Sequence, residues 1–440
     1  MKTVSRAVMM VVYAAAACSF SIAAQWPGAL FVFVPAFLAV NLLAGVPYGA
    51  VKNTRMRFCI HGADSLVIFL GSTLLAILCH LLLAAWMLPN AWQTFLWSAL
   101  VCVLVEAALF WNGMICLYCF SLQLGLKMRV IGGICGMIPV VNLIVLGKML
   151  RIVYTEIRFE IEKAELNEKR QKNRICATKY PILLVHGVFF RDFKLLNYWG
   201  RIPSELEQNG AKVYYGQHQS ARPVRESARE LARRIEEITR QTGCEKVNII
   251  AHSKGGLDCR CALQDPAVAG RVASLTTVNT PHRGCVFADY LLEKISPDVQ
   301  QKVAAAYNKA AAVLGDEDPD FLAAVGDLTA SACQRFNEEM ADPPEEILCQ
   351  SVGSIMRRAR HGKFPMRHSF HIVSHFDGPN DGLVGESSFP WGRRHMLLTT
   401  DGDRGISHGD MIDMNRENIP NFDVREFYVQ LVAQLKEMGL

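Results

Sequence analysis

The sequence predicts two parts: an all-α apolar region, and an α/β domain with a mostly parallel sheet and helices on both faces. The first observation is charge, because residues 1–150 contain eight Lys and Arg and two Asp and Glu, whereas residues 151–440 contain 38 and 39. The second is that, from residue 178 onward, short apolar runs alternate with amphipathic stretches, as in β–α–β units. This composition excludes a disordered chain, a collagen-like chain and a small disulfide-rich secreted domain.

The first 150 residues are predicted to form a transmembrane region of four or five helices. A bilayer core of about 30 Å needs roughly 20 apolar residues per helix. The first run could instead be a cleaved signal peptide, since Ala23-Ala24 resembles a cleavage site, but further apolar runs follow at once and favour an uncleaved helix. Apolar runs of spanning length occur at about 7–24, 28–46, 65–88, within 92–126 and at 130–147.

The few positive charges of this region predict its orientation. Loops rich in Lys and Arg stay in the cytoplasm, so the N-terminus and the charged loops are expected there. The net charge of +5 therefore indicates membrane orientation rather than nucleic-acid binding. The fifth run contains several glycines and Pro139, and whether it crosses decides the side of the following domain, which the sequence leaves open. The charges in question are Lys2, Arg6, Lys52, Arg55, Arg57, Lys127 and Arg129.

The charged remainder is predicted to be a helical linker and one α/β domain. Residues 151–177 combine apolar positions at helical spacing with many charges and contain no Gly or Pro, which predicts the linker. The domain is expected at 178–440, and its residues 286–347, which are mostly helix-forming and lie between strands, are interpreted as an insertion. An amphipathic helix is predicted at 224–243. Strands are predicted at 181–187, 211–216, 246–253, 272–281 and 370–376.

A serine motif provides the sharpest functional signal. Ala251-His252-Ser253-Lys254-Gly255 follows the apolar run VNII and precedes a predicted helix, which is the context of a nucleophile elbow. Such a turn exposes the serine hydroxyl, and the positions two before and two after it must be small because strand and helix backbones nearly touch there. Ser253 would also lie at a helix N-terminus, where free N–H groups and the helix dipole favour developing negative charge.

Backbone amides for an oxyanion hole are expected at two places. In elbows of this kind one donor is the residue after the nucleophile, here Lys254, and the other follows an earlier strand, here Val188 after His186-Gly187. The alternative for His186-Gly187 is an ordinary strand end. The Lys254 side chain is expected to be solvated at the surface and to have no catalytic part.

An acid and a histidine should follow the serine in chain order. Asp381 lies in an Asn-Asp-Gly turn after the predicted strand at 370–376, where a carboxylate can orient an imidazole. Two histidines follow: His408 lies in a loop before the final helix, whereas His395 stands beside two arginines and is expected at the surface. Asp377 is the second choice for the acid, and the less favoured candidates are Asp401 and Asp403.

Together these motifs resemble bacterial triacylglycerol lipases of the α/β-hydrolase superfamily. The similarity runs in family order over roughly residues 178–430 and rests on AHSKGGLD, VASLTTVNTPHRG, NDGLV, the ISHGD loop and DLTASACQRFN. It implies an α/β-hydrolase fold and a serine carboxylester hydrolase with Ser253 as nucleophile, His408 as base and Asp381 as orienting acid. The resemblance also implies a helical lid within the insertion. The apolar first third has no counterpart in the typical secreted members.

The resemblance implies a lipid or acyl-ester substrate, no required cofactor and a bacterial protein, and the apolar runs predict that it is a multi-pass protein of the cell membrane. Analogy with secreted lipases leans toward an extracytoplasmic catalytic domain, and tethering would hold the site beside insoluble esters. The same residues could serve an esterase, a phospholipase, a thioesterase or an acyltransferase. Outside enzymes, the alternative is an inactive, membrane-tethered binding module. The sequence does not predict the oligomeric state.

The sequence also offers candidate ligands for two metal sites, one for calcium and one for zinc. The family often holds a structural calcium near the catalytic histidine; Asp410 matches one ligand position, but no acid stands at the matching upstream position. Strand histidines near a catalytic site more often pack or form hydrogen bonds than bind metal, so zinc is not expected in the second cluster. That cluster comprises His361, His368, His371 and His375, whose spacing could ligate zinc.

Overall fold

The computed structural model describes residues 2–45, 51, 53–136, 138, 140–188, 197–313 and 315–440. It divides into two compact units, Met1–Leu166 and Asn167–Leu440. Lys52 and Pro139, which enter the orientation argument, lie outside the described residues.

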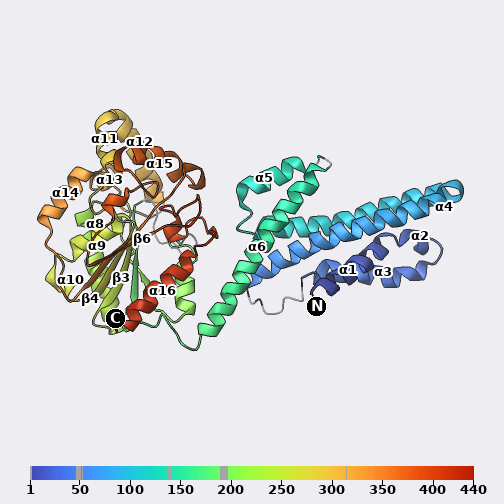
Figure 1. Ribbon diagram of the computed structural model, residues 1–440, viewed down its shortest axis with the longest axis horizontal. Helices are drawn as coiled ribbons and strands as arrows, with labels where there is room; N and C mark the ends of the chain where they lie inside the picture. The colour runs from blue at the N-terminus through green and yellow to red at the C-terminus, as the bar shows by residue number, and fades with distance from the viewer. Residues whose placement is uncertain are drawn as a thin grey trace. The chain divides into compact units, whose positions relative to one another are not determined.

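The first unit is helical, and its longest element is α4 (Thr54–Phe120). Among the described residues, α4 is the one helix that is long and apolar enough to cross a membrane. It consists of two helices that meet at Ala91, where φ is −152° and ψ is 46°, just after Pro89. The two halves fold back against each other (Figure 1), and a Cβ on Gly62 would lie 2.6 Å from the Cβ of Cys116. Hence α4 is a helical hairpin rather than one straight rod.

The remaining helices of this unit do not confirm a bundle of four or five spans. The runs at 65–88 and 92–126 fall on the two halves of α4, but those at 7–24 and 28–46 fall on helices shorter than a bilayer core requires. The run at 130–147 is divided between two helices. The bounds are α1 (Lys2–Ala17), α2 (Phe20–Ala23), η1 (Pro27–Ala29), α3 (Leu30–Leu43), α5 (Gly125–Cys135) and α6 (Val141–Arg170).

The second unit confirms the predicted parallel sheet. Its described strands form one six-stranded sheet in the order β2-β1-β3-β4-β5-β6, and all neighbouring pairs are parallel. The first four strands coincide with predicted runs. The bounds are β1 (Ile182–Val185), β2 (Val213–Tyr215), β3 (Val247–His252), β4 (Val272–Val278), β5 (Leu348–Ser354) and β6 (Arg394–Leu398).

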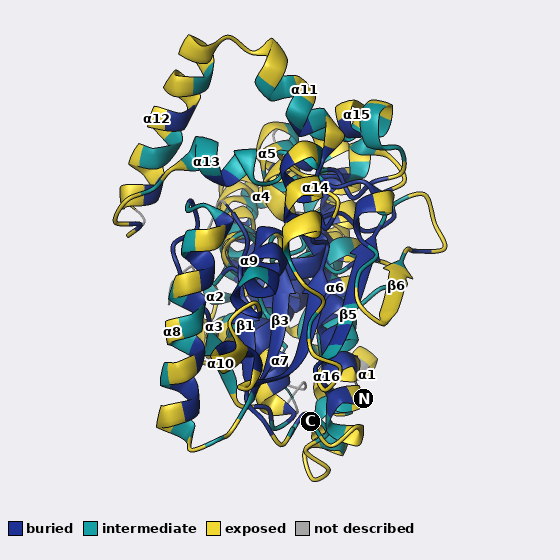
Figure 2. Ribbon diagram, turned by 90° about the vertical axis from the view of Figure 1, so that its left-hand side faces the viewer, coloured by how far each residue is buried: buried dark blue, intermediate teal, exposed yellow. Residues whose placement is uncertain are grey.

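Helices cover both faces of the sheet because successive strand side chains point to opposite sides. Ile182 and Leu184 of β1 pack in one apolar cluster with α7 (Ile202–Gln208) and α16 (Val424–Glu437). Leu183 and Val185 pack in a second cluster with α8 (Val224–Thr242), α9 (Lys254–Ala262) and α10 (Pro266–Ala269). Figure 2 shows the buried strands between these helices. Each fully buried Leu or Ile side chain contributes about 1.5–3 kcal/mol.

The segment between β4 and β5 is helical. It forms α11 (Val286–Lys294), α12 (Pro297–Val313), α13 (Phe321–Gly326) and α14 (Ala330–Glu339). In Figure 2, α11 and α12 extend beyond the end of the sheet.

The predicted strand at 370–376 is wrong, because these residues belong to α15 (Met366–Asp377). Met366 and Val373, seven residues apart on one helical face, are buried, whereas Ile372 is exposed. A short apolar run fits either periodicity, which explains the error. The strand that occupies this place in the chain is β5, whose sequence LCQSVGS is too polar and too small to stand out as an apolar run.

Candidate active site

Ser253 connects β3 to α9 in a conformation that L-residues rarely adopt, with φ 56° and ψ −131°. Its backbone N–H donates to the carbonyl of Val278 at the end of β4, at 2.9 Å, so the turn is held by the neighbouring strand. A backbone of this kind costs about 1–3 kcal/mol and persists where the surroundings enforce it.

Small residues around Ser253 allow the end of β1, the end of β3 and the start of α9 to lie close together. A Cβ on Gly255 would lie 2.4 Å from the carbonyl oxygen of His186, and one on Gly187 would lie 2.8 Å from the Cβ of Ser253. Ala251 is fully buried. The crowding at Gly255 therefore comes from the end of β1, the strand that pairs with β3.

Asp381 and His408 form a buried pair. His408 Nδ1 lies 2.6 Å from Asp381 Oδ2, and the His408 backbone N–H donates to the Asp381 carbonyl at 2.8 Å. A hydrogen bond from Nδ1–H to the carboxylate leaves Nε2 as the proton acceptor. Ser253, His408 and Val188 line one cavity, so the structure brings four of the predicted positions together when Asp381 is included.

Asn279, which lies in the motif VASLTTVNTPHRG, is a site residue that the sequence did not predict. It follows β4 with φ 48°, and its side-chain amide donates to Asp381 Oδ2 at 2.7 Å and to Ser354 Oγ at 2.8 Å. The backbone N–H groups of Leu383 and Val384 donate to the other carboxylate oxygen, at 2.9 and 2.8 Å. The Asp381 carboxylate is thus fixed by donors from two separate segments. A polar residue directly after a buried strand was the signal available in the sequence.

The Lys254 side chain is not solvated, which corrects the expectation. It is 1 % exposed, and its Nζ donates to Asp258 Oδ1 at 2.7 Å and to Ser227 Oγ at 3.0 Å. The i, i+4 spacing on α9 places the carboxylate beside it. Burial raises the pKa of Asp258 to about 6, although the Lys254 ammonium opposes the shift. The Lys254 backbone N–H lies at the first position of α9, where no intrahelical acceptor exists.

A buried aromatic pair supports the His408 ring. The ring centroids of His252 and His408 are 4.5 Å apart, and His252 Nδ1 lies 2.8 Å from the Tyr198 hydroxyl. Burial, together with the charge that His408 can carry, holds the pKa of His252 well below its usual value. A neutral His252 packs against His408 without adding a competing positive charge.

The other predicted candidates lie elsewhere. Asp377 accepts the backbone N–H groups of Val286 and Phe287, at 2.9 and 3.1 Å, and so caps the start of α11. Asp403 pairs with two arginines, and Asp401 is exposed. His395 is exposed on β6, as expected.

The described residues do not fit a calcium ion beside His408. The Asp410 carboxylate accepts from Arg404 Nη1 and from the Ser407 backbone N–H, both at 2.8 Å, so a guanidinium already supplies the positive charge. The four histidines considered as zinc ligands, His361, His368, His371 and His375, do not lie close enough together to share one ion. Within the described part of the chain, one group of His, Cys, Asp or Glu side chains is close enough to share an ion, namely Cys18, His80 and Cys102.

A family model described as the alpha/beta hydrolase fold matches residues 180–427, which is more than half of the chain. The chain belongs to the α/β-hydrolase fold family. Over 175 residues the chain is 36 % identical to a triacylglycerol lipase of Pseudarthrobacter phenanthrenivorans, covering 37 % of this chain and 54 % of the relative. It therefore spans about half the length of that relative.

Two further proteins are similar over a longer range. A triacylglycerol lipase of Vibrio cholerae is 28 % identical over 289 residues, which cover 60 % of this chain and 89 % of the relative. Among solved structures, lipase 1 from Pelosinus fermentans is 16 % identical with a TM-score of 0.45, covering 60 % of this chain and 100 % of the Pelosinus chain.

Proposed function

We propose that this protein is a membrane-anchored serine carboxylester hydrolase, and specifically a lipase that cleaves long-chain acyl esters. One observation carries the proposal: His408, which is paired with Asp381, lines the same apolar cavity as Ser253, whose backbone is that of a nucleophile elbow. The similarity to triacylglycerol lipases supports the same class of reaction.

The reaction follows from this geometry. His408 Nε2 accepts the Ser253 hydroxyl proton as Oγ attacks the ester carbonyl, and the Asp381 carboxylate holds the imidazolium. The backbone N–H groups of Val188 and Lys254 receive the oxyanion, each donor being worth roughly 3–4 kcal/mol in the transition state. His408 then protonates the leaving alcohol, and water releases the acid from the acyl-enzyme by the same steps.

The cavity favours a long acyl chain. Its volume is about 660 Å³, and α11, α12 and α13 together supply a large part of its apolar wall. Each methylene removed from water contributes about 0.8 kcal/mol, so turnover should improve with chain length until the cavity is filled. These three helices therefore act as the lid of the site. Their lining side chains include Leu291, Val299, Val303, Phe321, Leu322 and Val325.

Labelling with a fluorophosphonate tests the hydrolase proposal on the full chain in detergent. We expect labelling of the wild type and none of Ser253→Ala; equal labelling of the two would exclude Ser253 as the nucleophile. A series of p-nitrophenyl esters from acetate to palmitate tests the lipase assignment. A strict preference for acetate would make the protein a short-chain esterase instead.

We further infer that the hydrolase unit lies in the cytoplasm. Three arginines of the first unit gather at the open end of the α4 hairpin: Arg6 pairs with Asp64 at 2.5 Å, Arg55 donates to the carbonyl of Phe120 at 2.8 Å, and Arg129 donates to the carbonyl of Ser121 at 2.7 Å. Positively charged ends stay in the cytoplasm.

The chain leaves the first unit at this same end. The 11 residues of α5 rise about 16 Å, too little to cross a bilayer core of about 30 Å. On α6, Tyr154 donates to Asp64 at 2.7 Å and Glu156 pairs with Arg55 at 2.6 Å, so the helix has returned to the charged end. The run at 130–147 thus enters and returns, contrary to the analogy with secreted lipases.

Protease treatment of intact cells that produce the chain with a C-terminal tag tests this topology. We expect the tag to survive in intact cells and to be lost after permeabilisation. Loss of the tag from intact cells would place the hydrolase unit outside the cytoplasm.

A further inference from the structure

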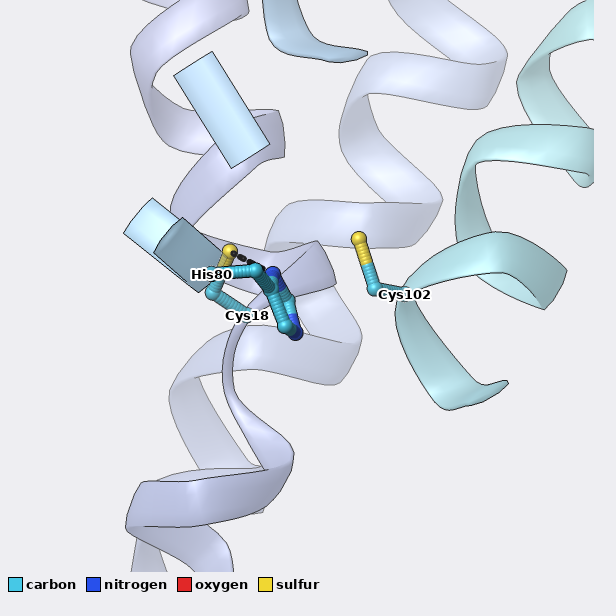
Figure 3. A group of neighbouring side chains, drawn as sticks. All are labelled: Cys18, His80 and Cys102. Atoms are coloured by element: carbon cyan, nitrogen blue, oxygen red, sulfur yellow. Dashed lines mark hydrogen bonds between the residues drawn. The ribbon is translucent and has the colours of Figure 1, made fainter. Parts of the chain in front are cut away.

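We propose that Cys18, His80 and Cys102 bind one Zn²⁺ ion in the first unit, at a site separate from Ser253. The three side chains come from the residue after α1, from the first half of α4 and from its second half. Their ligand atoms all lie within 4.8 Å of one another. Figure 3 shows Cys18 against the His80 ring and Cys102 on the neighbouring helical segment.

The spacing of two of these atoms fits one tetrahedral ion. Zinc lies about 2.3 Å from thiolate sulfur and about 2.0–2.1 Å from imidazole nitrogen, which sets the two ligands about 3.6 Å apart at a tetrahedral angle. Cys18 Sγ lies 3.7 Å from His80 Nδ1. The two groups therefore need little movement to share a zinc ion.

The second nitrogen of His80 has the partner that a zinc ligand needs. Nε2 lies 3.2 Å from Ser98 Oγ, so an Nε2–H can donate there while Nδ1 faces the sulfur. Histidine ligands of zinc usually donate their other N–H in this way. Nδ1 also lies 2.9 Å from the carbonyl of Ala76, so zinc competes with an Nδ1–H bond along the helix.

Charge and ligand type select zinc. Two thiolates and one imidazole suit a soft ion, whereas Ca²⁺ and Mg²⁺ prefer oxygen ligands. Cys102 packs with Ala17 and Ala76 in an apolar cluster. Two thiolates neutralise Zn²⁺, so the complex adds no net charge to these surroundings, whereas Cu⁺ would leave an uncompensated negative charge.

A cavity supplies the fourth coordination position. His80, Cys102 and Glu106 line a cavity of about 590 Å³ within the first unit. Glu106, one helical turn after Cys102, is only 5 % exposed, and its Oε1 has no hydrogen-bond partner among the described residues. Its Oε2 accepts from the hydroxyls of Ser72 and Thr73, at 2.9 and 3.0 Å. Three protein ligands leave one zinc position open for water, and Glu106 is the group that holds it.

Zinc bound here joins the end of α1 to both halves of α4. It stabilises the first unit and takes no part in the hydrolysis at Ser253, so loss of zinc should leave fluorophosphonate labelling intact. The inference therefore stands or falls independently of the proposed function.

Elemental analysis of the full chain, purified in detergent without chelator, tests the site. We expect about one zinc per chain in the wild type and in Cys119→Ser, an exposed cysteine of the same unit. We expect at least a tenfold loss in Cys18→Ser, His80→Ala and Cys102→Ser, with size-exclusion profiles as the check of folding.

Cobalt exchange keeps the test valid if the variants do not fold. Wild-type protein loaded with Co²⁺ should show thiolate-to-cobalt charge transfer and the visible bands of a tetrahedral ion. Absence of these bands, zinc retained in all three variants, copper in place of zinc, or a Cys18–Cys102 disulfide in non-reducing peptide mapping would each overturn the proposal.

Discussion

The Asp381 carboxylate accepts hydrogen bonds from three donors in addition to the His408 imidazole, and this arrangement makes its replacement informative. In Asp381→Asn, the amide can turn its N–H₂ toward Nδ1 of His408, which leaves the imidazole proton on Nε2. A protonated Nε2 cannot accept the proton of the Ser253 hydroxyl. We expect kcat on p-nitrophenyl butyrate to fall roughly 10⁴-fold. Asp377→Asn is the matched control, and we expect it to lose less than tenfold. Equal losses would refute the assignment of Asp381 as the orienting acid.

The Lys254–Asp258 pair gives a pH dependence with a defined sign. Burial raises the pKa of folded Asp258 to about 6 from 3.8. As pH falls from 6 toward 4, the folded protein binds a proton at Asp258 before the unfolded chain does, so the free energy of unfolding increases over this pH range. Above pH 6 the Asp258 carboxylate is charged in both states, and the folded protein bears the cost of burying that charge.

We therefore expect the melting temperature of the wild type, relative to Asp258→Asn, to rise as pH falls from 7 to 4. The measurement is thermal unfolding of the full chain in detergent across that range. Asp318→Asn, at a side chain that is 83 % exposed, should show no such trend. A constant difference between wild type and Asp258→Asn would show that Asp258 does not titrate there.

The contact between α9 and the end of β1 determines whether the elbow can form. In Gly255→Ala, the new Cβ would lie 2.4 Å from a backbone oxygen that cannot move without shifting β1. We expect at least a 100-fold loss of ester hydrolysis, because a shift of about 1 Å at the reacting atoms has an effect of this size.

Gly243→Ala is the control for this element. Gly243 ends α8 with φ 68° and has open space around it, so alanine there costs about 1 kcal/mol of stability without touching the site. We expect a lower melting temperature with unchanged kcat. Comparable kinetic losses in the two variants would mean that the crowding at Gly255 has no particular role.

Asp377 caps α11, the first helix of the proposed lid. Asp377→Ala removes the acceptor for two N–H groups at the start of α11, a loss of about 1 kcal/mol in helix stability. We expect kcat/KM for palmitate esters to fall severalfold while that for acetate is unchanged, because only the long chain needs the wall formed by the lid. Asp265→Ala, which removes the cap of α10, should leave this ratio unchanged. A loss shared equally by acetate and palmitate would place the effect outside the lid.

The same elements show how far the sequence predicts the fold. The strands β1 to β4 could be located because each is a largely apolar run between turn residues, fully buried in β1, β3 and β4 and partly buried in β2. The polar β5 and the exposed β6 lack that pattern. Seven residues of α15, 370–376, form an apolar run that was predicted as a strand. The positions of Ser253, Asp381 and His408 follow from local motifs, whereas Asn279 and the buried Lys254–Asp258 pair depend on contacts between separate segments.

At the scale of the whole molecule, the division into two units predicts that they can be separated. Arg170, near the end of α6, pairs with Glu426 of α16 at 2.8 Å, so the end of α6 belongs to the second unit. A chain that begins at residue 160 should hydrolyse soluble p-nitrophenyl butyrate within threefold of the full chain.

Lipid substrates should distinguish the two chains. We expect the shortened chain to cleave triacylglycerol in vesicles at least tenfold more slowly, because tethering raises the local concentration of site and substrate. Full chain reconstituted into the same vesicles is the reference. Equal rates on vesicles would show that the first unit contributes nothing to substrate access.

The edge strand β6 affects how readily the folded protein aggregates. Among the described strands, β6 borders only β5, and its Met396 and Leu397 are 45 % and 38 % exposed. An open apolar edge is a template on which another chain can add a strand. Arg393 and Arg394 lie at the start of this edge, and we expect their positive charges to repel approaching copies. Neutralising these two charges should therefore cause aggregation of folded molecules before any loss of the native structure.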